Sequence, residues 1–145
     1  IIPRLVEMGV DPSLIAPTLI LGVAQRLLRR IAEGAAVPVE KEESVKKIIQ
    51  EQFADLPEEY KNKFDLDRNL FDVKPTKDAP SGMKGRLAIL EMFPVDKDIE
   101  QIILNNPTEL AIYESARSKG MLTLKDSAML KGLEGLVPFS EINTL

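Results

Sequence analysis

The longest run of apolar residues lies near the start of the chain, at residues 13–31. Its first half is apolar at nearly every position, whereas its second half alternates apolar with polar residues. Pro17 interrupts a helix and Gly22 interrupts its continuation, so the pattern predicts a short buried helix and then a half-buried strand over 24–31. Its continuously apolar part ends before Gln25 and is too short to span a membrane. We therefore predict that it forms core.

Capping signals predict the helices of the first third. Gly9 ends a helix over 2–8, and Asp11 with Pro12 at the first helical position begins another. A third helix is predicted over 40–54, where acids precede lysines in the way that suits the helix dipole. Its apolar residues share one face and mark a buried stripe: Val45, Ile48, Ile49 and Phe53.

The middle of the chain carries weaker signals. Residues 33–38 are small and predict a loop, and Pro57 opens a second short helical piece. Residues 65–81 are also predicted to be mostly loop, with a short strand as an alternative around Phe71.

A second strand is predicted over 86–93, where apolar and polar residues alternate and Pro94 ends the pattern. Leu87, Ile89 and Phe93 would share one side. If this strand pairs with 24–31, three basic side chains of that strand come near Glu91: Arg26, Arg29 and Arg30.

The last third predicts three helix starts. Asp96 caps the first helix, which turns its isoleucines inward. The segment 106–109 is close to a capping box with Pro107 at the first helical position, and Thr123 with Asp126 repeats that signal. The third helix would bury Met129, Leu130 and Leu133, and a final turn begins at Pro138.

Composition sets the outer bounds. The chain has 145 residues, 44% hydrophobic and 29% charged, which is enough for one domain with a core. The net charge of −4 argues against a nucleic-acid partner. The absence of Cys and His excludes disulfides, thiolate metal sites and imidazole chemistry. With no signal peptide or membrane segment visible, we expect a cytoplasmic chain, and its start at Ile1 suggests that it has been cut from a larger protein.

The search for catalytic motifs gives mostly negative results. No Gly-x-x-x-x-Gly-Lys-[Ser/Thr] phosphate loop occurs, and the glycine pair around Lys84 opens a predicted strand, so a turn is expected there. Without His, a Ser or Cys nucleophile lacks its usual base. The acids at 40–44 and 57–60 are interpreted as solvated helix starts in preference to a cation site.

Three segments together resemble one protein family. The first is RLVEMGVDPSLIAPTLILGVAQRLLRR at 4–30, the second is GMKGRLAILEMFPV at 82–95, and the third is GMLTLKDSAMLKGLEGLVPFSEI at 120–142. In this order they are similar to the type II secretion and type IV pilus assembly ATPases, the protein E family. The fold expected from pattern and resemblance is α+β, predominantly helical with a small antiparallel sheet, as the C-terminal part of a RecA-like ATPase.

The resemblance also implies an organisation and a function. Residues 1–31 would end the nucleotide-binding core region, 32–81 would be a variable excursion, and 82–145 would form a C-terminal strand and helical subdomain. The chain would be the C-terminal fragment of a hexameric ATPase that powers secretion or pilus assembly. It would support subunit packing and platform contact without hydrolysing ATP alone.

The implied partners are neighbouring subunits of a homo-hexamer and inner-membrane platform proteins, which would hold the cytoplasmic protein at the inner membrane. No nucleic acid is expected, and ATP and magnesium are implied only for the full-length protein. Arg26 falls on the family's Gln-Arg-Leu position and Arg86 on its Lys-Gly-Arg position. The residues predicted for a subunit or core interface are Gln25, Arg26, Arg29, Arg30, Lys84, Arg86 and Glu91; hydrogen bonds or ion pairs that stabilise the fold are the alternative for the two arginines that match the motifs.

The chain departs from the family at two places. Many members carry a Cys-x-x-Cys pair where this chain has residues 32–35 and 78–81, so zinc is not expected. The excursion would instead be held by the stripe of the 40–54 helix. Two alternatives to the motor remain open: a stand-alone helical protein-binding module, and, less favoured for lack of acid/base groups, an independent enzyme.

Overall fold

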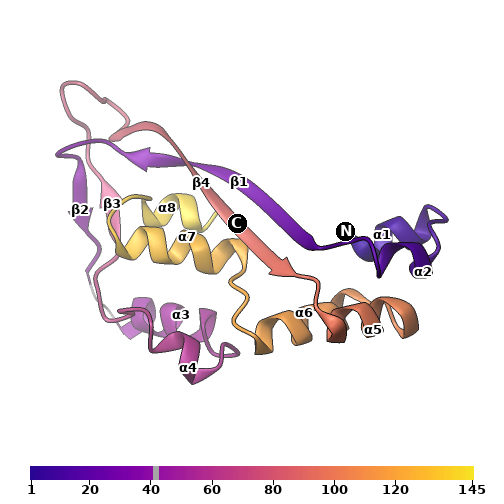
Figure 1. Ribbon diagram of the computed structural model, residues 1–145. Coiled ribbons are helices and arrows are strands. Elements are labelled where there is room, and N and C mark those ends of the chain that lie inside the picture. Colours follow the sequence, from indigo (N-terminus) through magenta and orange to yellow (C-terminus); the bar gives the residue numbers. More distant parts are fainter. Residues whose placement is uncertain (41–42) are drawn as a thin grey trace. The chain divides into compact units, whose positions relative to one another are not determined.

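The computed structural model describes residues 1–40 and 43–145 (Figure 1). The fold is α+β, as predicted, with helices more extensive than strands in this part of the chain. The helices are α1 (Ile2–Glu7), α2 (Pro12–Ile15), α3 (Glu43–Gln52), α4 (Glu58–Lys61), α5 (Lys97–Asn105), α6 (Glu109–Ser118), α7 (Leu124–Leu133) and α8 (Phe139–Ile142). The strands are β1 (Leu21–Ile31), β2 (Ala36–Pro38), β3 (Phe71–Val73) and β4 (Met83–Pro94).

The two long strands pair with each other, as predicted. β1 and β4 form a two-stranded sheet and run in opposite directions in Figure 1. Each strand begins three residues earlier than the alternation of apolar and polar residues predicted, β1 at Leu21 and β4 at Met83. Pairing explains the difference, because backbone hydrogen bonds continue past the point where the side-chain pattern stops alternating.

A second small sheet joins β2 to β3 in antiparallel register, with Ala36 opposite Val73 and Pro38 opposite Phe71. The prediction of a loop over 33–38 was therefore wrong for β2, whereas the strand considered around Phe71 is present. Three residues ending in Pro carry too little pattern to show a strand, and the pairing partner lies far away in sequence.

The chain divides into two compact units. Unit 1 contains Ile1–Ala24 and Met92–Met121, and unit 2 contains Gln25–Glu91 and Leu122–Leu145. Each unit has its own apolar core. The buried residues of unit 1 come from the first two helices and from the α5–α6 region: Ile2, Ile15, Ala16, Ile99, Ile103, Ile112, Ala116 and Met121.

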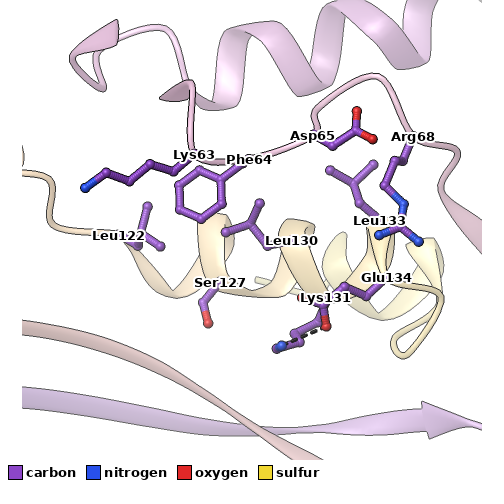
Figure 2. A pocket seen from close by; sticks show the side chains of 10 residues that line it. All are labelled: Lys63, Phe64, Asp65, Arg68, Leu122, Ser127, Leu130, Lys131, Leu133 and Glu134. Carbon is purple, nitrogen blue, oxygen red and sulfur yellow. Dashed lines mark hydrogen bonds and ion pairs between the residues drawn. The ribbon is translucent and has the colours of Figure 1, made fainter. Parts of the chain in front are cut away.

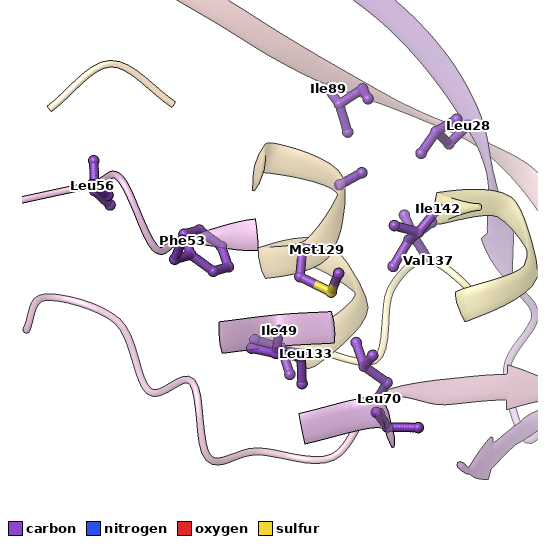
Figure 3. Packing of buried hydrophobic residues seen from close by; sticks show 12 residues of the cluster. Leu28, Ile49, Phe53, Leu56, Leu70, Ile89, Met129, Leu133, Val137 and Ile142 are labelled. Atoms are coloured by element: carbon purple, nitrogen blue, oxygen red, sulfur yellow. The ribbon is translucent and has the colours of Figure 1, made fainter. Parts of the chain in front are cut away.

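The core of unit 2 is built around α7 and α3. Phe53 and Ile49 lie beside Met129 and Leu133, and strand residue Ile89 also belongs to this core (Figure 3). The predicted stripe of α3 is confirmed for Val45, Ile49 and Phe53 and wrong for Ile48, which is exposed. Residues 41–42 of the predicted helix lie outside the described residues.

The apolar run at 13–31 is less buried than predicted. Leu28 and Ile31 are buried, but Ile20 is 80% exposed, and Val23 and Leu27 are each 54% exposed. A sheet of two strands leaves one face uncovered unless another element packs on it, and only the Leu28 side of β1 joins the core of unit 2. The prediction of a core segment was therefore wrong for most of the strand.

The capping predictions can be checked residue by residue. Asp11 accepts from the backbone N–H of Ser13, Asp96 from that of Ile99, and Thr123 and Asp126 form a complete capping box, all as predicted. The box placed at 106–109 was wrong, because the N-cap of α6 is Thr108 and not Asn106. Thr108 accepts from Ala111, so the helix starts two residues later than Pro107 suggested.

Candidate functional site

The seven predicted interface residues all lie in unit 2, on its two long strands. β1 carries Gln25, Arg26, Arg29 and Arg30, and β4 carries Lys84, Arg86 and Glu91. The structure separates them into two groups. Arg29 and Glu91 are used in contacts within the fold, whereas the other five are exposed.

Arg29 is held by a carboxylate at the end of the chain. Its Nε donates to Glu141 Oε1 at 2.9 Å, its Nη2 donates to the same oxygen at 2.7 Å, and its backbone N–H donates to Oε2 at 3.0 Å. Burial alone would raise the pKa of the Glu141 carboxyl, but the hydrogen bonds and charge of Arg29 outweigh it and lower that pKa below its ordinary value of 4.5. The pair fixes α8 to β1.

Glu91 caps the start of α7. Its Oε2 accepts from the backbone N–H of Leu124 at 3.1 Å. The predicted contact between Glu91 and the arginines was therefore wrong for Arg29, whose guanidinium meets Glu141. The register explains this: Ala32 N–H donates to Gly82 O, so in antiparallel strands Arg29 lies opposite the beginning of β4, well before Glu91.

Arg30 and Lys84 line one surface hollow of about 480 Å³. Glu33, Gly34 and Leu136 complete its walls. Neither cation has an ion pair or hydrogen bond within residues 1–40 and 43–145. The structure therefore brings together two predicted site residues from different strands as exposed positive charges, which can bind a carboxylate or phosphate group.

Gln25, Arg26 and Arg86 are exposed along the strands and do not converge on a pocket among those described. Sequence reasoning missed Glu141, the partner of Arg29, because the two residues are 112 positions apart. No local pattern marked it, since Glu141 lies among the other polar residues of the chain end, Ser140, Asn143 and Thr144.

The glycine pair at 82–85 is not a phosphate loop. Both Gly82 and Gly85 have a left-handed backbone, with φ of 72° and 77°, and they flank the first residues of a strand. A phosphate loop needs backbone donors at the start of a helix. These residues therefore do not fit the phosphates of ATP.

The two segments at the family's cysteine positions lie together in space. Ala32, Ala35 and Ala79 are buried in one small cluster with Ile31, and Phe71 and Val73 pack against it. Methyl groups offer no metal ligands, so these side chains do not fit zinc. This alanine cluster is thus a second apolar contact of the excursion, beside the predicted one through α3.

The described residues lack two further features, a metal site and a membrane-spanning helix. They contain no group of three or more Asp or Glu side chains arranged to hold a metal ion. None of the helices described is long and apolar enough to cross a membrane.

Comparison with known proteins gives matches along nearly the whole chain. The family model described as "Type II/IV secretion system protein" matches residues 1–144. A type IV pilus assembly ATPase PilB of Thermus thermophilus is 33% identical over 143 residues, which is 97% of this chain and 15% of the relative.

Two further relatives are 29% identical to this chain. One is a PilB of Acinetobacter baylyi, and the other is a type II secretion system protein E of Xanthomonas campestris. Each match covers 97% of this chain and 23% or 24% of the relative, so the chain spans less than a quarter of the length of these proteins. The extent of the family match shows that the chain belongs to the type II/IV secretion system protein family.

Proposed function

We propose that this chain is the C-terminal part of a RecA-like, hexameric ATPase that powers type II secretion or type IV pilus assembly. In this role it supports packing between neighbouring subunits and contact with inner-membrane platform proteins, and it does not hydrolyse ATP by itself. The observation that carries the proposal is the family match over residues 1–144, together with relatives that are named as pilus assembly ATPases and secretion protein E.

The strand cations support an interface role. Arg30 and Lys84 are exposed in one hollow, and Arg26 and Arg86 are exposed nearby in sequence, while Arg29 is already neutralised by Glu141. Exposed charges of one sign steer a partner of the opposite sign and fix its orientation. A neighbouring subunit that presents carboxylates would suit this surface.

ATP and magnesium would be bound elsewhere in the full-length protein. The sequence contains no phosphate loop, and residues 1–40 and 43–145 contain no cluster of acids that could hold the metal. The chain's own contribution would therefore be mechanical and organisational. In the cell we expect it in the cytoplasm, at the inner membrane through its partners.

The decisive experiment compares this chain with the full-length protein that contains it. ATP hydrolysis and molecular mass are measured for both. We expect the full-length protein to hydrolyse ATP as a hexamer and the isolated chain to be inactive. A full-length protein that is both inactive and monomeric would contradict the motor and favour a protein-binding module.

Charge reversal of the hollow tests the role of its cations. Arg30→Glu with Lys84→Glu should lower the hexamer fraction and ATP hydrolysis of the full-length protein. The matched control is Lys77→Glu with Lys125→Glu, two exposed lysines outside the hollow. Unchanged assembly and activity in the double variant would remove these two residues from the interface.

A further inference from the structure

A second hollow of unit 2 combines an apolar floor with positive ends. It has a volume of about 410 Å³ and lies between α7 and the segment that follows α4. Phe64 and Leu130 lie in its middle, Leu122 lies near Lys63, and Lys63 and Arg68 lie at opposite ends (Figure 2). None of these residues belongs to the seven predicted from the sequence.

The charges of this hollow are only partly neutralised from within. Lys131 is paired with Glu134 at 2.8 Å, and the Asp65 carboxylate accepts from the backbone N–H of Asp67. Arg68 has no ion pair among the described residues, and Lys63 has only the ring of Tyr60, 4.9 Å from its Nζ. Three cations and two carboxylates line the hollow, which leaves it with a net positive charge. The hollow therefore fits an apolar side chain that is accompanied by carboxylates.

Unit 1 presents such a group on α6. Leu110 is 65% exposed, and the helix places Glu114 four residues on, on the same face. Glu109 precedes Leu110 directly, and both carboxylates are exposed. The opposite face of α6, with Ile112 and Ala116, is buried in the core of unit 1. Leu110 thus projects from the exposed face of α6 with an acid on either side, while the other face of the helix is buried in the core of unit 1. Glu109, Leu110 and Glu114 together are called the α6 projection.

We propose that the α6 projection of one copy of this protein docks into the hollow of a neighbouring copy. Leu110 would lie against Phe64 and Leu130, and the carboxylates of Glu109 and Glu114 would face Lys63 and Arg68. The inference rests on the proposed function, since it names the surfaces of the subunit contact. The two surfaces are different, so each copy offers one of each and the contact is head-to-tail, the kind that closes into a ring.

A charge-reversal cycle in the full-length protein tests the electrostatic half of the proposal. Lys63→Glu with Arg68→Glu should weaken self-association at least about tenfold, since like charges then face each other across the contact. Glu109→Lys with Glu114→Lys should do the same, and the two double variants mixed together should associate with each other again. Lys77→Glu with Lys97→Glu, two exposed lysines outside the hollow, is the control for the change in net charge.

Cross-linking tests the placement. This stretch has no native cysteine, so Leu110→Cys and Ser127→Cys introduce its only thiols. Copies with different tags, each with one substitution, should form a disulfide-linked dimer when mixed, and neither variant alone should. A third variant carries both substitutions in one copy. A disulfide that forms only within that copy, with none between copies, would overturn the proposal.

The outcomes separate the two proposals. If the wild type is an active hexamer and the two double charge variants leave it unchanged, the docking is wrong and the motor function stands. If the wild type neither hydrolyses ATP nor self-associates, both are wrong. The docking is supported if each double charge variant fails to self-associate, the two associate when mixed, and the disulfide between copies forms.

Discussion

Glu141 is a buried carboxylate whose charge is satisfied by three hydrogen bonds from one residue, Arg29. The side chain of Glu141 is 11% exposed, whereas that of Arg29 is 58% exposed. The cost of burying the acid is therefore offset by a cation that keeps most of its own hydration. This asymmetry makes the pair less costly to form than a fully buried one.

Glu141→Gln should destabilise unit 2 by about 1 kcal/mol near pH 7, because a neutral amide accepts weaker hydrogen bonds from Arg29. The pKa of Glu141 is lowered in the folded state, so its stabilisation is present above 4.5 and is lost as pH falls through the lower, folded value. The difference between wild type and variant should therefore shrink in acid. Urea unfolding at several pH values measures it, with the exposed Glu33→Gln as control.

A second residue-scale prediction concerns the two glycines at the start of β4. Both have positive φ, but a Cβ on Gly82 would lie 2.7 Å from Lys74 O and from Val73 Cβ, whereas one on Gly85 would meet nothing within 4 Å. Gly85→Ala should cost about 1–2 kcal/mol for its backbone alone. Gly82→Ala should cost clearly more, since backbone has to move. Equal losses in urea unfolding would show that the crowding at Gly82 is relieved without cost.

At the scale of elements, α7 is the described helix with the most complete local start signal, a full capping box, and it packs against both α3 and α8. Its capping box joins Thr123 to Asp126, and Asp126 Oδ1 also accepts from Gln52 of α3 at 2.7 Å. One buried carboxylate thus both begins α7 and binds α3 to it. The apolar contacts of α7 with Ile49 and Phe53 lie beside this hydrogen bond.

Asp126→Ala should destabilise unit 2 by about 3 kcal/mol, because it removes a buried charged acceptor of two half-buried donors, the backbone N–H of Thr123 and the side-chain amide of Gln52. Thr123→Ala should cost only about 1 kcal/mol, the usual loss of one N-cap. Lys125→Ala, on an exposed neighbour, is the control. A Thr123 variant as unstable as the Asp126 variant would mean that the cap, and not the α3 contact, dominates.

The elements that could be predicted are those whose signals are local. Asp11, Asp96 and the Thr123 box fixed helix starts, because a cap and its partners lie within three residues. β2 could not be predicted, since its three residues become a strand only by pairing with β3. The α6 start was misplaced because two hydroxyl or amide caps, Asn106 and Thr108, compete within one segment.

The candidate site was predictable in residue type but not in arrangement. The strand cations were found from the sequence, yet their division into paired Arg29 and exposed Arg30 and Lys84 depends on α8 and on strand register. The alanine cluster and the hollow beside Phe64 join segments that are remote in sequence. No local pattern reports such contacts.

At the scale of the whole molecule, two separate cores stabilise one chain. Ile103 and Met129 are fully buried, one in each core. Truncation of either side chain to Ala should cost about 2–5 kcal/mol, and the loss should fall mainly on its own unit.

Hydrogen exchange measured by mass spectrometry checks this prediction. Ile103→Ala should speed exchange in α5 and α6 more than in α7, and Met129→Ala should do the reverse. Each variant serves as the control for the other. Equal acceleration throughout the chain after either change would mean that the two cores unfold as one cooperative body.

Both units are also discontinuous in sequence, since the chain crosses between them after Ala24, Glu91 and Met121. During synthesis, residues 1–24 therefore leave the ribosome long before their partners at 92–121, and α3 waits for α7. Until then Ile2, Ile15, Ile49 and Phe53 lack the later residues of their cores, and apolar segments that wait for such partners are what chaperones bind and what aggregates. The order of translation thus makes the final third of this chain the step that completes both units.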